Sequence, residues 1–199
     1  MGEEYDVISS FEAVEPNKIS NPYYYRLAIE AAEGEFAKVL CDQFISDYYT
    51  LGKGMNYWGY GCDNTAVFLT AIAVYASDYS EYVNDAMKII AGYTTDKGAY
   101  YSEQYTDENA NSTAMALMAF SALGDCDTAL KYYNMLLNFQ GETGIFTYYG
   151  NADLYATKDC VTALGYFSDL VYSNSLEHNE HIYTSTEIAP TCGTAGKKT

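Results

Sequence analysis

The sequence has few basic residues, few prolines and only two histidines. Lys and Arg number 10 of 199 residues, against 27 Asp and Glu, which gives a formal net charge of −17 at pH 7. A surface of this sign repels phosphate groups, so we expect no nucleic-acid partner and no binding to an anionic membrane. No run of about 18 or more apolar residues occurs, and we therefore expect no membrane insertion.

Disulfide and metal-binding motifs are also missing. The five cysteines are odd in number, lie far apart and form no C-x-x-C pair, so they do not build a disulfide framework. The histidines, His178 and His181, lie with Cys192 in the C-terminal tail. We expect no metal site and no cofactor. The other cysteines fall in or beside apolar segments, where a free thiol behaves as a small hydrophobic group: Cys41, Cys62, Cys126 and Cys160.

The start of the chain, MGEEYDVISSFEA, has neither the basic nor the apolar region of a signal peptide. Two alternatives follow: the protein is cytoplasmic if the chain is complete, or the chain is a piece of a longer exported protein. Its length and its apolar content of 49% suit one domain with a sizeable core.

Apolar residues recur at helical spacing in seven segments, which predicts an all-α fold. Their character alternates along the chain. The third and fifth segments are apolar almost all round, whereas the second, fourth and sixth carry one apolar stripe. We therefore expect inner helices three, five and seven, with helix one inner by continuation, and outer helices two, four and six. The expected ranges are about 22–33, 35–49, 64–76, 80–92, 112–123, 126–139 and 156–171.

Three segments share one plan: a glycine, an aromatic cluster, a polar loop, a threonine at a helix start and an apolar helix. They span residues 52–71, 96–119 and 142–164. Their glycines, Gly54, Gly98 and Gly144, lie 44 and 46 residues apart, a period that holds two helices and two connections. The repeat predicts inner and outer layers of helices.

The stretch ALKYYNMLLNFQGETGIF contains Gln140, Gly144 and Phe146 at the spacing of a known repeat. In this it resembles the α/α-toroid superfamily of terpenoid cyclases and protein prenyltransferases, with Phe where that family usually has Trp. The preceding copy keeps Gly98 but has Thr94 in place of the glutamine. The resemblance covers about residues 20–172 and implies a partial α/α toroid of about seven helices, too few to close the ring.

A second resemblance is to large cell-surface proteins of anaerobic Firmicutes. It is carried by the stretches NPYYYRLAIEAAEG, GKGMNYWGYGCDNTA and ANSTAMAL, and by the tail HIYTSTEIAPTCGTAGKKT. It implies an extracellular or cell-surface location and other domains of a longer chain as partners. We divide the chain into an N-terminal extension at 1–20, the helical domain at 21–172, and a linker with the truncated start of a Cys-containing module at 173–199.

The stretch GCDNTA resembles the D-x-D-D-T-A motif in which class II cyclases place a protonating aspartic acid, and Asp63 falls on its middle Asp. Gly61 stands in place of the first Asp of the motif, and Asn64 stands in place of the last. The stretch NANSTA has the same outline without a carboxylate, and such residues are also typical of a helix start. We interpret Asp63 as a helix cap and the chain as non-enzymatic. The alternative is a cyclase-like or prenyltransferase-like enzyme with Asp63 as the acid.

Tyrosine is unusually common, with 23 residues, and many lie in the loops before helices three, five and seven. Aromatic rings beside Asn and Asp suit stacking and hydrogen bonding to a sugar or an extended peptide. The alternative is that these rings pack between repeats as a second core layer. We expect a binding or spacer module that binds a glycan or peptide on a concave face. The predicted ligand-binding residues are Tyr57, Trp58, Tyr60, Asp63, Asn64, Tyr100, Asn111 and Tyr148.

Overall fold

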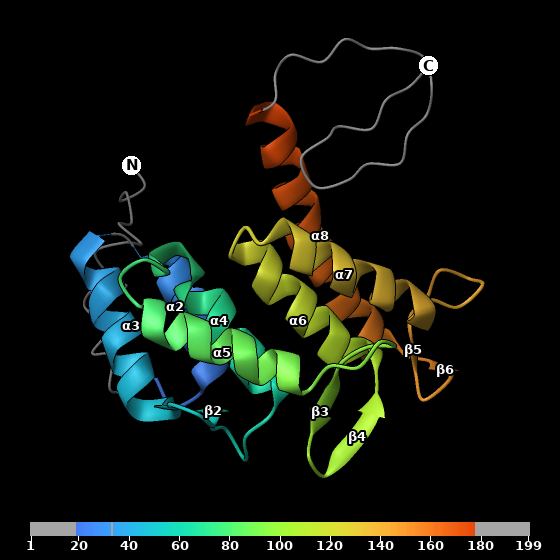
Figure 1. The fold of residues 1–199 in the computed structure, drawn as a ribbon, viewed down its shortest axis with the longest axis horizontal. Helices are drawn as coiled ribbons and strands as arrows, with labels where there is room; N and C mark the ends of the chain where they lie inside the picture. The colour runs from blue at the N-terminus through green and yellow to red at the C-terminus, as the bar shows by residue number, and fades with distance from the viewer. Residues whose placement is uncertain (1–18, 33, 178–199) are drawn as a thin grey trace, which may run out of the picture.

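The computed structural model describes residues 19–32 and 34–177 (Figure 1). These residues form seven α-helices and three short antiparallel strand pairs, which confirms the prediction of an all-α fold. None of the helices in this part of the chain is long and apolar enough to cross a membrane. The helices are α2 Pro22–Ala31, α3 Gly34–Tyr48, α4 Cys62–Ile72, α5 Ser80–Gly92, α6 Ala110–Ala122, α7 Cys126–Leu136 and α8 Leu154–Glu177.

Two of the expected helices end in tighter turns. The 3-10 turn η2, Ala73–Tyr75, follows α4, and η3, Leu137–Phe139, follows α7. Both lie inside the ranges predicted for helices three and six, because a 3-10 turn continues the same apolar pattern for one more turn.

A strand pair precedes each of α4, α6 and α8, and the sequence did not predict any of them. Strands of two to four residues are too short for an alternating pattern to be visible. In the first pair Tyr49 faces Met55, and in the last Thr147 faces Ala152. The strands are β1 Tyr49–Thr50, β2 Gly54–Met55, β3 Tyr100–Ser102, β4 Tyr105–Glu108, β5 Thr147–Tyr148 and β6 Asn151–Ala152.

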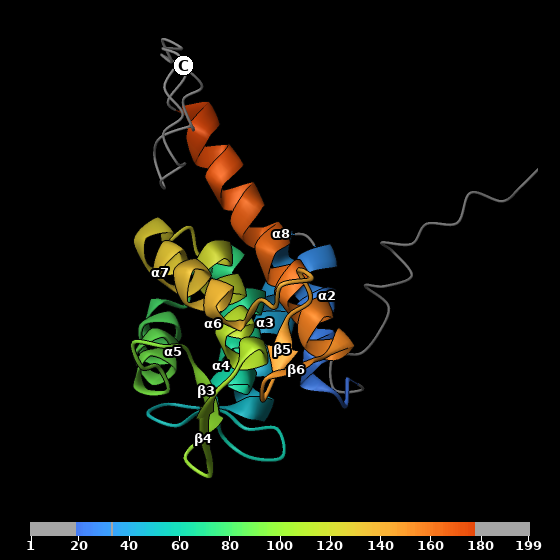
Figure 2. The same cartoon turned by 90° about the vertical axis from the view of Figure 1, so that its right-hand side faces the viewer.

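The helices form the two layers that the alternation predicts. In the inner layer α2 contacts α4, α4 contacts α6, and α6 contacts α8, while α3, α5 and α7 pack on α2, α4 and α6. Figure 2 shows α4 and α6 between the outer helices α5 and α7 and the pair α2 and α8. Most residues of α4 and α6 are buried, whereas the outer helices bury one stripe each. A helix that is apolar all round must be covered on all sides, which α4 and α6 achieve.

Helix α8 differs from the expected seventh helix in length and burial. It buries Ala156, Cys160 and Ala163 against its neighbours, but the Val161 side chain is exposed. It also runs to Glu177, inside the segment predicted as a linker from 173. The residues SNSLE contain no Gly or Pro to end a helix, so the helix continues past the packed body.

Side-chain contacts join the first and the last of the inner helices. Arg26 Nη1 on α2 donates to Tyr166 Oη on α8 at 3.1 Å, and the Tyr166 hydroxyl donates to Glu30 Oε1 at 2.6 Å. Arg26 also pairs with Glu30 at 3.6 Å. The half-buried Arg26 cation thus pairs with Glu30 within α2 and reaches α8 through the Tyr166 hydroxyl.

The threonine of each repeat fastens the loop to the inner helix. Each side-chain oxygen accepts a hydrogen bond from a loop N–H, at 2.9 to 3.4 Å, and donates to the carbonyl four residues earlier. Close to this contact a side chain has no room, because a Cβ on Gly98 would lie 2.8 Å from Thr113 Oγ1. Gly54 is crowded by Thr65 in the same way, which explains why glycine and threonine recur together in the first two copies, whereas Gly144 has only Gln140 nearby, at 4.0 Å. The three contacts are Thr65 with Met55, Thr113 with Ala99, and Thr157 with Phe146.

Candidate functional site

Two adjoining hollows lie where the loops meet the N-terminal ends of the inner helices. The larger, of about 600 Å³, we call the tyrosine hollow, since it is lined chiefly by Tyr60, Tyr100, Tyr101 and Tyr105 with Lys53, Glu103 and Gln104. The smaller, of about 290 Å³, we call the acidic hollow. Tyr101 belongs to both. The acidic hollow is lined by Asp63, Tyr101, Asn109, Asn111, Ser112, Tyr148, Asp153 and Tyr155.

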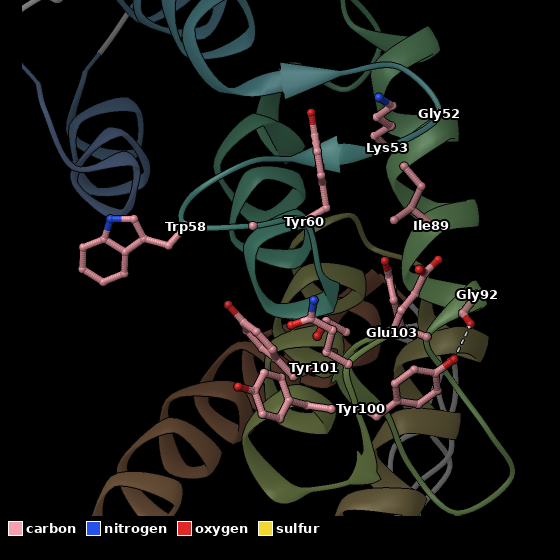
Figure 3. Close-up of a pocket in the computed structure, with 14 residues that line it drawn as sticks. Gly52, Lys53, Trp58, Tyr60, Ile89, Gly92, Tyr100, Tyr101 and Glu103 are labelled. Atoms are coloured by element: carbon pink, nitrogen blue, oxygen red, sulfur yellow. Dashed lines mark hydrogen bonds between the residues drawn. The ribbon is translucent and has the colours of Figure 1, made fainter.

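The tyrosine hollow is built by the loop before α4, the C-terminal end of α5 and the β3–β4 hairpin (Figure 3). Two of its rings are anchored by hydrogen bonds from their hydroxyl groups. The Tyr100 hydroxyl donates to the Gly92 carbonyl oxygen at 3.1 Å, and the Tyr60 hydroxyl donates to Thr50 Oγ1 at 3.4 Å. Lys53 Nζ lies 5.8 Å from the centroid of the Tyr60 ring. The hollow therefore offers fixed aromatic faces with charged and amide groups at its edge.

Trp58 stands beside this hollow with 91% of its surface exposed. Its ring points away from the other labelled lining residues (Figure 3). Its φ of 56° lies in the left-handed region, which is costly for a bulky residue. The Tyr57 ring stacks on it at a centroid distance of 4.6 Å. An exposed, supported tryptophan in a strained backbone is typical of a contact surface.

Asn64 holds the Trp58 loop from inside. Its Nδ2 donates to the carbonyl oxygens of Tyr57 at 3.0 Å and Gly59 at 2.9 Å, and its Oδ1 accepts from the Tyr23 hydroxyl at 3.2 Å. Asn64 is only 2% exposed. Asn64 therefore positions Tyr57 and Trp58 and has almost no exposed surface with which to contact a ligand.

Asp63 does not occupy the cap position of α4 and lies instead in the first turn of the helix, so the sequence interpretation misplaced it. Gly61 occupies the cap position and makes no side-chain cap hydrogen bond, and Asp63 Oδ1 is buried without a hydrogen-bond partner among the described residues. The glycine at the cap has no side-chain oxygen, and Asp63 follows it inside the first turn, where its carboxyl points into the acidic hollow.

Burial raises the pKa of the Asp63 carboxyl to about 6. The nearby Ser112 hydroxyl acts to lower the pKa, the negative charge of Asp159 acts to raise it, and the backbone N–H of Asp63 acts to lower it. No hydrogen bond of good geometry joins Ser112 to Asp63, since Ser112 Oγ also has no partner among the described residues. Ser112 is fully buried, with 0% exposure. Two unpartnered polar groups therefore meet at one edge of the hollow.

The remaining charge of the acidic hollow is partly compensated. Asn111 Nδ2 donates to Asp159 Oδ2 at 2.8 Å, and Lys158 Nζ pairs with Asp159 Oδ1 at 2.8 Å. Asp153 caps α8, because its Oδ1 accepts from the Ala156 N–H at 2.7 Å. Asp63 Oδ1 has no such partner among the described residues.

The repeat explains which residues reach the acidic hollow. Asp63, Asn111 and Tyr155 each stand two residues before the repeat threonine, and all three line the hollow. Four residues before the threonine stand Gly61, Asn109 and Asp153, of which the last two cap their helices. The sequence reasoning missed Tyr155 and Asp153 as site residues, although this alignment of the copies points to both. Nothing in the sequence singles out Ser112 or Asp159, which depend on how α6 and α8 pack.

Metal or thiol chemistry finds no support in residues 19–32 and 34–177. No group of three His, Cys, Asp or Glu side chains there could hold a metal ion. Cys160 is buried, and burial raises the pKa of its thiol to about 12. Burial likewise raises the pKa of the Cys62 thiol. The tail residues His178, His181 and Cys192 lie outside the described residues.

The eight predicted ligand-binding residues thus fall into three places. Trp58, Tyr60 and Tyr100 line the tyrosine hollow, and Asp63, Asn111 and Tyr148 line the acidic hollow. Tyr57 and Asn64 support the Trp58 loop from behind. No family model matches the chain, and no curated protein or solved structure matches it.

Proposed function

We propose that the chain is a non-catalytic glycan-binding module of a bacterial surface protein, built on a partial α/α toroid. The observation that carries the proposal is the tyrosine hollow, where aromatic faces from separate loops converge beside the exposed Trp58. The location outside the cell and the longer parent chain are part of the proposal and rest on the sequence resemblances.

Sugar rings suit such a surface because their apolar C–H faces stack on flat aromatic rings while their hydroxyls form hydrogen bonds around the edge. The tyrosine hollow has both features, with Tyr101 and Tyr105 as rings and Glu103 and Gln104 as polar neighbours. The net charge of −17 disfavours acidic sugars. We therefore expect a neutral or cationic glycan.

The test is a titration of the protein with panels of neutral oligosaccharides and of extended peptides, followed by NMR and by the fluorescence of Trp58. Tyr105→Ala should abolish saturable glycan binding. Tyr24→Ala is the matched control, because Tyr24 on α2 is exposed to the same extent, 60%, but does not line either hollow. Saturation by peptides alone would change the ligand class, and no saturable response in either panel would reduce the module to a spacer.

A second candidate function is supported by Asp63, whose buried carboxyl has a pKa raised to about 6 by burial. Such a group can act as a general acid near neutral pH, as a cyclase-like or prenyltransferase-like enzyme would require. Against it, the acidic hollow is lined by polar and tyrosine side chains, which do not protect a carbocation from water. Incubation with polyprenyl substrates, with Asp63→Asn as the comparison, distinguishes the two functions by product formation.

A further inference from the structure

We infer that the acidic hollow binds a primary ammonium group, and that this group belongs to an amino sugar whose ring lies against Tyr101. The choice of a sugar rests on the proposed function, whereas the ammonium site rests on the acidic hollow alone. The acidic hollow would then be a second subsite next to the tyrosine hollow.

The charges around the hollow favour a cation. Asp63 and Asp153 line it directly, and Asp159 lies close enough to Asp63 to influence its ionisation. The lining contains no Lys or Arg among the described residues, and Lys158 is paired with Asp159 and mostly exposed. An entering ammonium group would therefore meet uncompensated negative charge, chiefly that of Asp63.

Two unpartnered groups supply the specific contacts. Asp63 Oδ1 and the fully buried Ser112 Oγ both belong to residues that line the hollow, and neither has a hydrogen-bond partner among the described residues. Buried polar groups without partners are rare in folded proteins and call for an explanation. Both oxygens are closed to solvent in this structure, so the lining must open to admit an ammonium group, whose three donors would then satisfy both oxygens at once.

The rest of the lining suits an organic cation better than a metal ion. The described residues contain no cluster of three metal-ligating side chains. The hollow instead has the rings of Tyr101, Tyr148 and Tyr155, whose faces attract an ammonium group by cation–π interaction. The Asn111 amide nitrogen is used by Asp159, which leaves the amide oxygen as an acceptor.

The position of Tyr101 favours an amino sugar over a lysine side chain. Tyr101 lines both hollows, so the stacking surface and the carboxylate lie next to each other. An amino sugar carries its ammonium group directly on the ring, which allows the ring to stack while the ammonium group reaches Asp63. A lysine side chain carries its charge on a flexible four-carbon stem and has no ring to stack on Tyr101.

The test compares a tetramer of glucosamine with a tetramer of N-acetylglucosamine by calorimetric titration at pH 7 and 0.15 M salt. The wild-type protein should bind the glucosamine tetramer at least about tenfold more tightly, because a charge-assisted hydrogen bond replaces a neutral one. Asp63→Asn and Ser112→Ala should each reduce this ratio, with Asp63→Asn bringing it close to one. Thermal melting of each variant verifies that it is folded.

Asp127→Asn is the matched control, because Asp127 is exposed on α7 and its replacement changes the net charge by the same amount. It should leave the ratio unchanged. A ratio near one in the wild-type protein overturns the inference, as does a ratio that survives in Asp63→Asn. Binding of a lysine tripeptide that depends on Asp63, without binding of the glucosamine tetramer, overturns the choice of an amino sugar.

The same titrations separate this inference from the proposed function. If only the glucosamine tetramer binds, and its binding depends on Asp63 but not on Tyr105, the acidic hollow binds amines and the tyrosine hollow is not the glycan site. If both tetramers bind equally and Tyr105→Ala abolishes both, the proposed function holds and the ammonium site is refuted.

Discussion

Replacing Asp63 by Asn should stabilise the protein at neutral pH. Burial raises the pKa of this carboxyl from 3.8 to about 6. Each pKa unit corresponds to about 1.4 kcal/mol, so ionised Asp63 lowers the free energy of unfolding by up to about 3 kcal/mol. Asn has nearly the same shape and no charge, and it removes this cost. For a protein of this size the melting temperature should rise by roughly 6–12 °C.

The sign of the pH dependence follows from where the proton is bound. Below pH 3.8 the carboxyl is protonated in both states, and the variant and the wild type should be equally stable. Between pH 3.8 and about 6 the unfolded chain releases the proton while the folded protein keeps it, so wild-type stability falls as the pH rises. Above about pH 6 both states are ionised and the difference becomes constant.

The side chains that face Asp63 do not shift the pH range in which its ionisation changes stability. Burial and the charge of Asp63 raise the pKa of Tyr23 on α2 and of Tyr101 on β3, so both phenols stay neutral throughout. Asp159 is held by Lys158 and Asn111, and Asp153 caps α8.

The assay is urea denaturation of the wild type, Asp63→Asn and Asp127→Asn at pH 3, 5 and 7. The difference between Asp63→Asn and the wild type should grow from near zero at pH 3 to about 2–3 kcal/mol at pH 7. Asp127→Asn, at an exposed position, should show no such growth. A destabilised Asp63→Asn variant at pH 7, or a difference that does not change with pH, would refute the reasoning.

Three further predictions concern the repeat and the exposed tryptophan. In denaturant titrations, Thr113→Val should cost about 1–3 kcal/mol because the buried Ala99 N–H loses its acceptor, whereas Thr113→Ser should cost much less. In melting experiments, Gly98→Ala should destabilise the fold because the new Cβ has no room, while Gly165→Ala, with open space in mid-helix, should stabilise it by roughly 0.5–1 kcal/mol. Trp58, the single tryptophan, should emit like tryptophan in water and be quenched freely by acrylamide, and a blue-shifted spectrum would contradict its exposure.

The helices could be predicted from the sequence because each inner helix is apolar on every face and each outer helix on one. The expected ranges for α3 and α5 agree with the structure to within one residue at each end. The contact between Arg26 and Tyr166 could not be predicted, because it joins residues 140 positions apart. The strand pairs escaped detection for a different reason, since their register depends on turns of a few residues and on no hydrophobic pattern.

The candidate site was predicted in part. Aromatic loops before each inner helix pointed correctly to the end of the layer where both hollows lie. The role of Asp63 was misjudged because a carboxylate at a helix start fits a cap equally well in sequence. Only the structure separates the two, since Gly61 stands at the cap position and Asp63 Oδ1 has no hydrogen-bond partner among the described residues.

The three copies of the repeat differ at a position that lines the acidic hollow. The threonine is kept in each copy and makes the same pair of hydrogen bonds, because every loop must be fastened to its helix. Two residues earlier stand Asp63, Asn111 and Tyr155, three side chains of different chemistry. Packing alone does not require this variety, and a buried, unpartnered carboxyl at one of the three positions lowers stability. A residue that costs stability at the edge of a hollow is better explained by a ligand than by the fold.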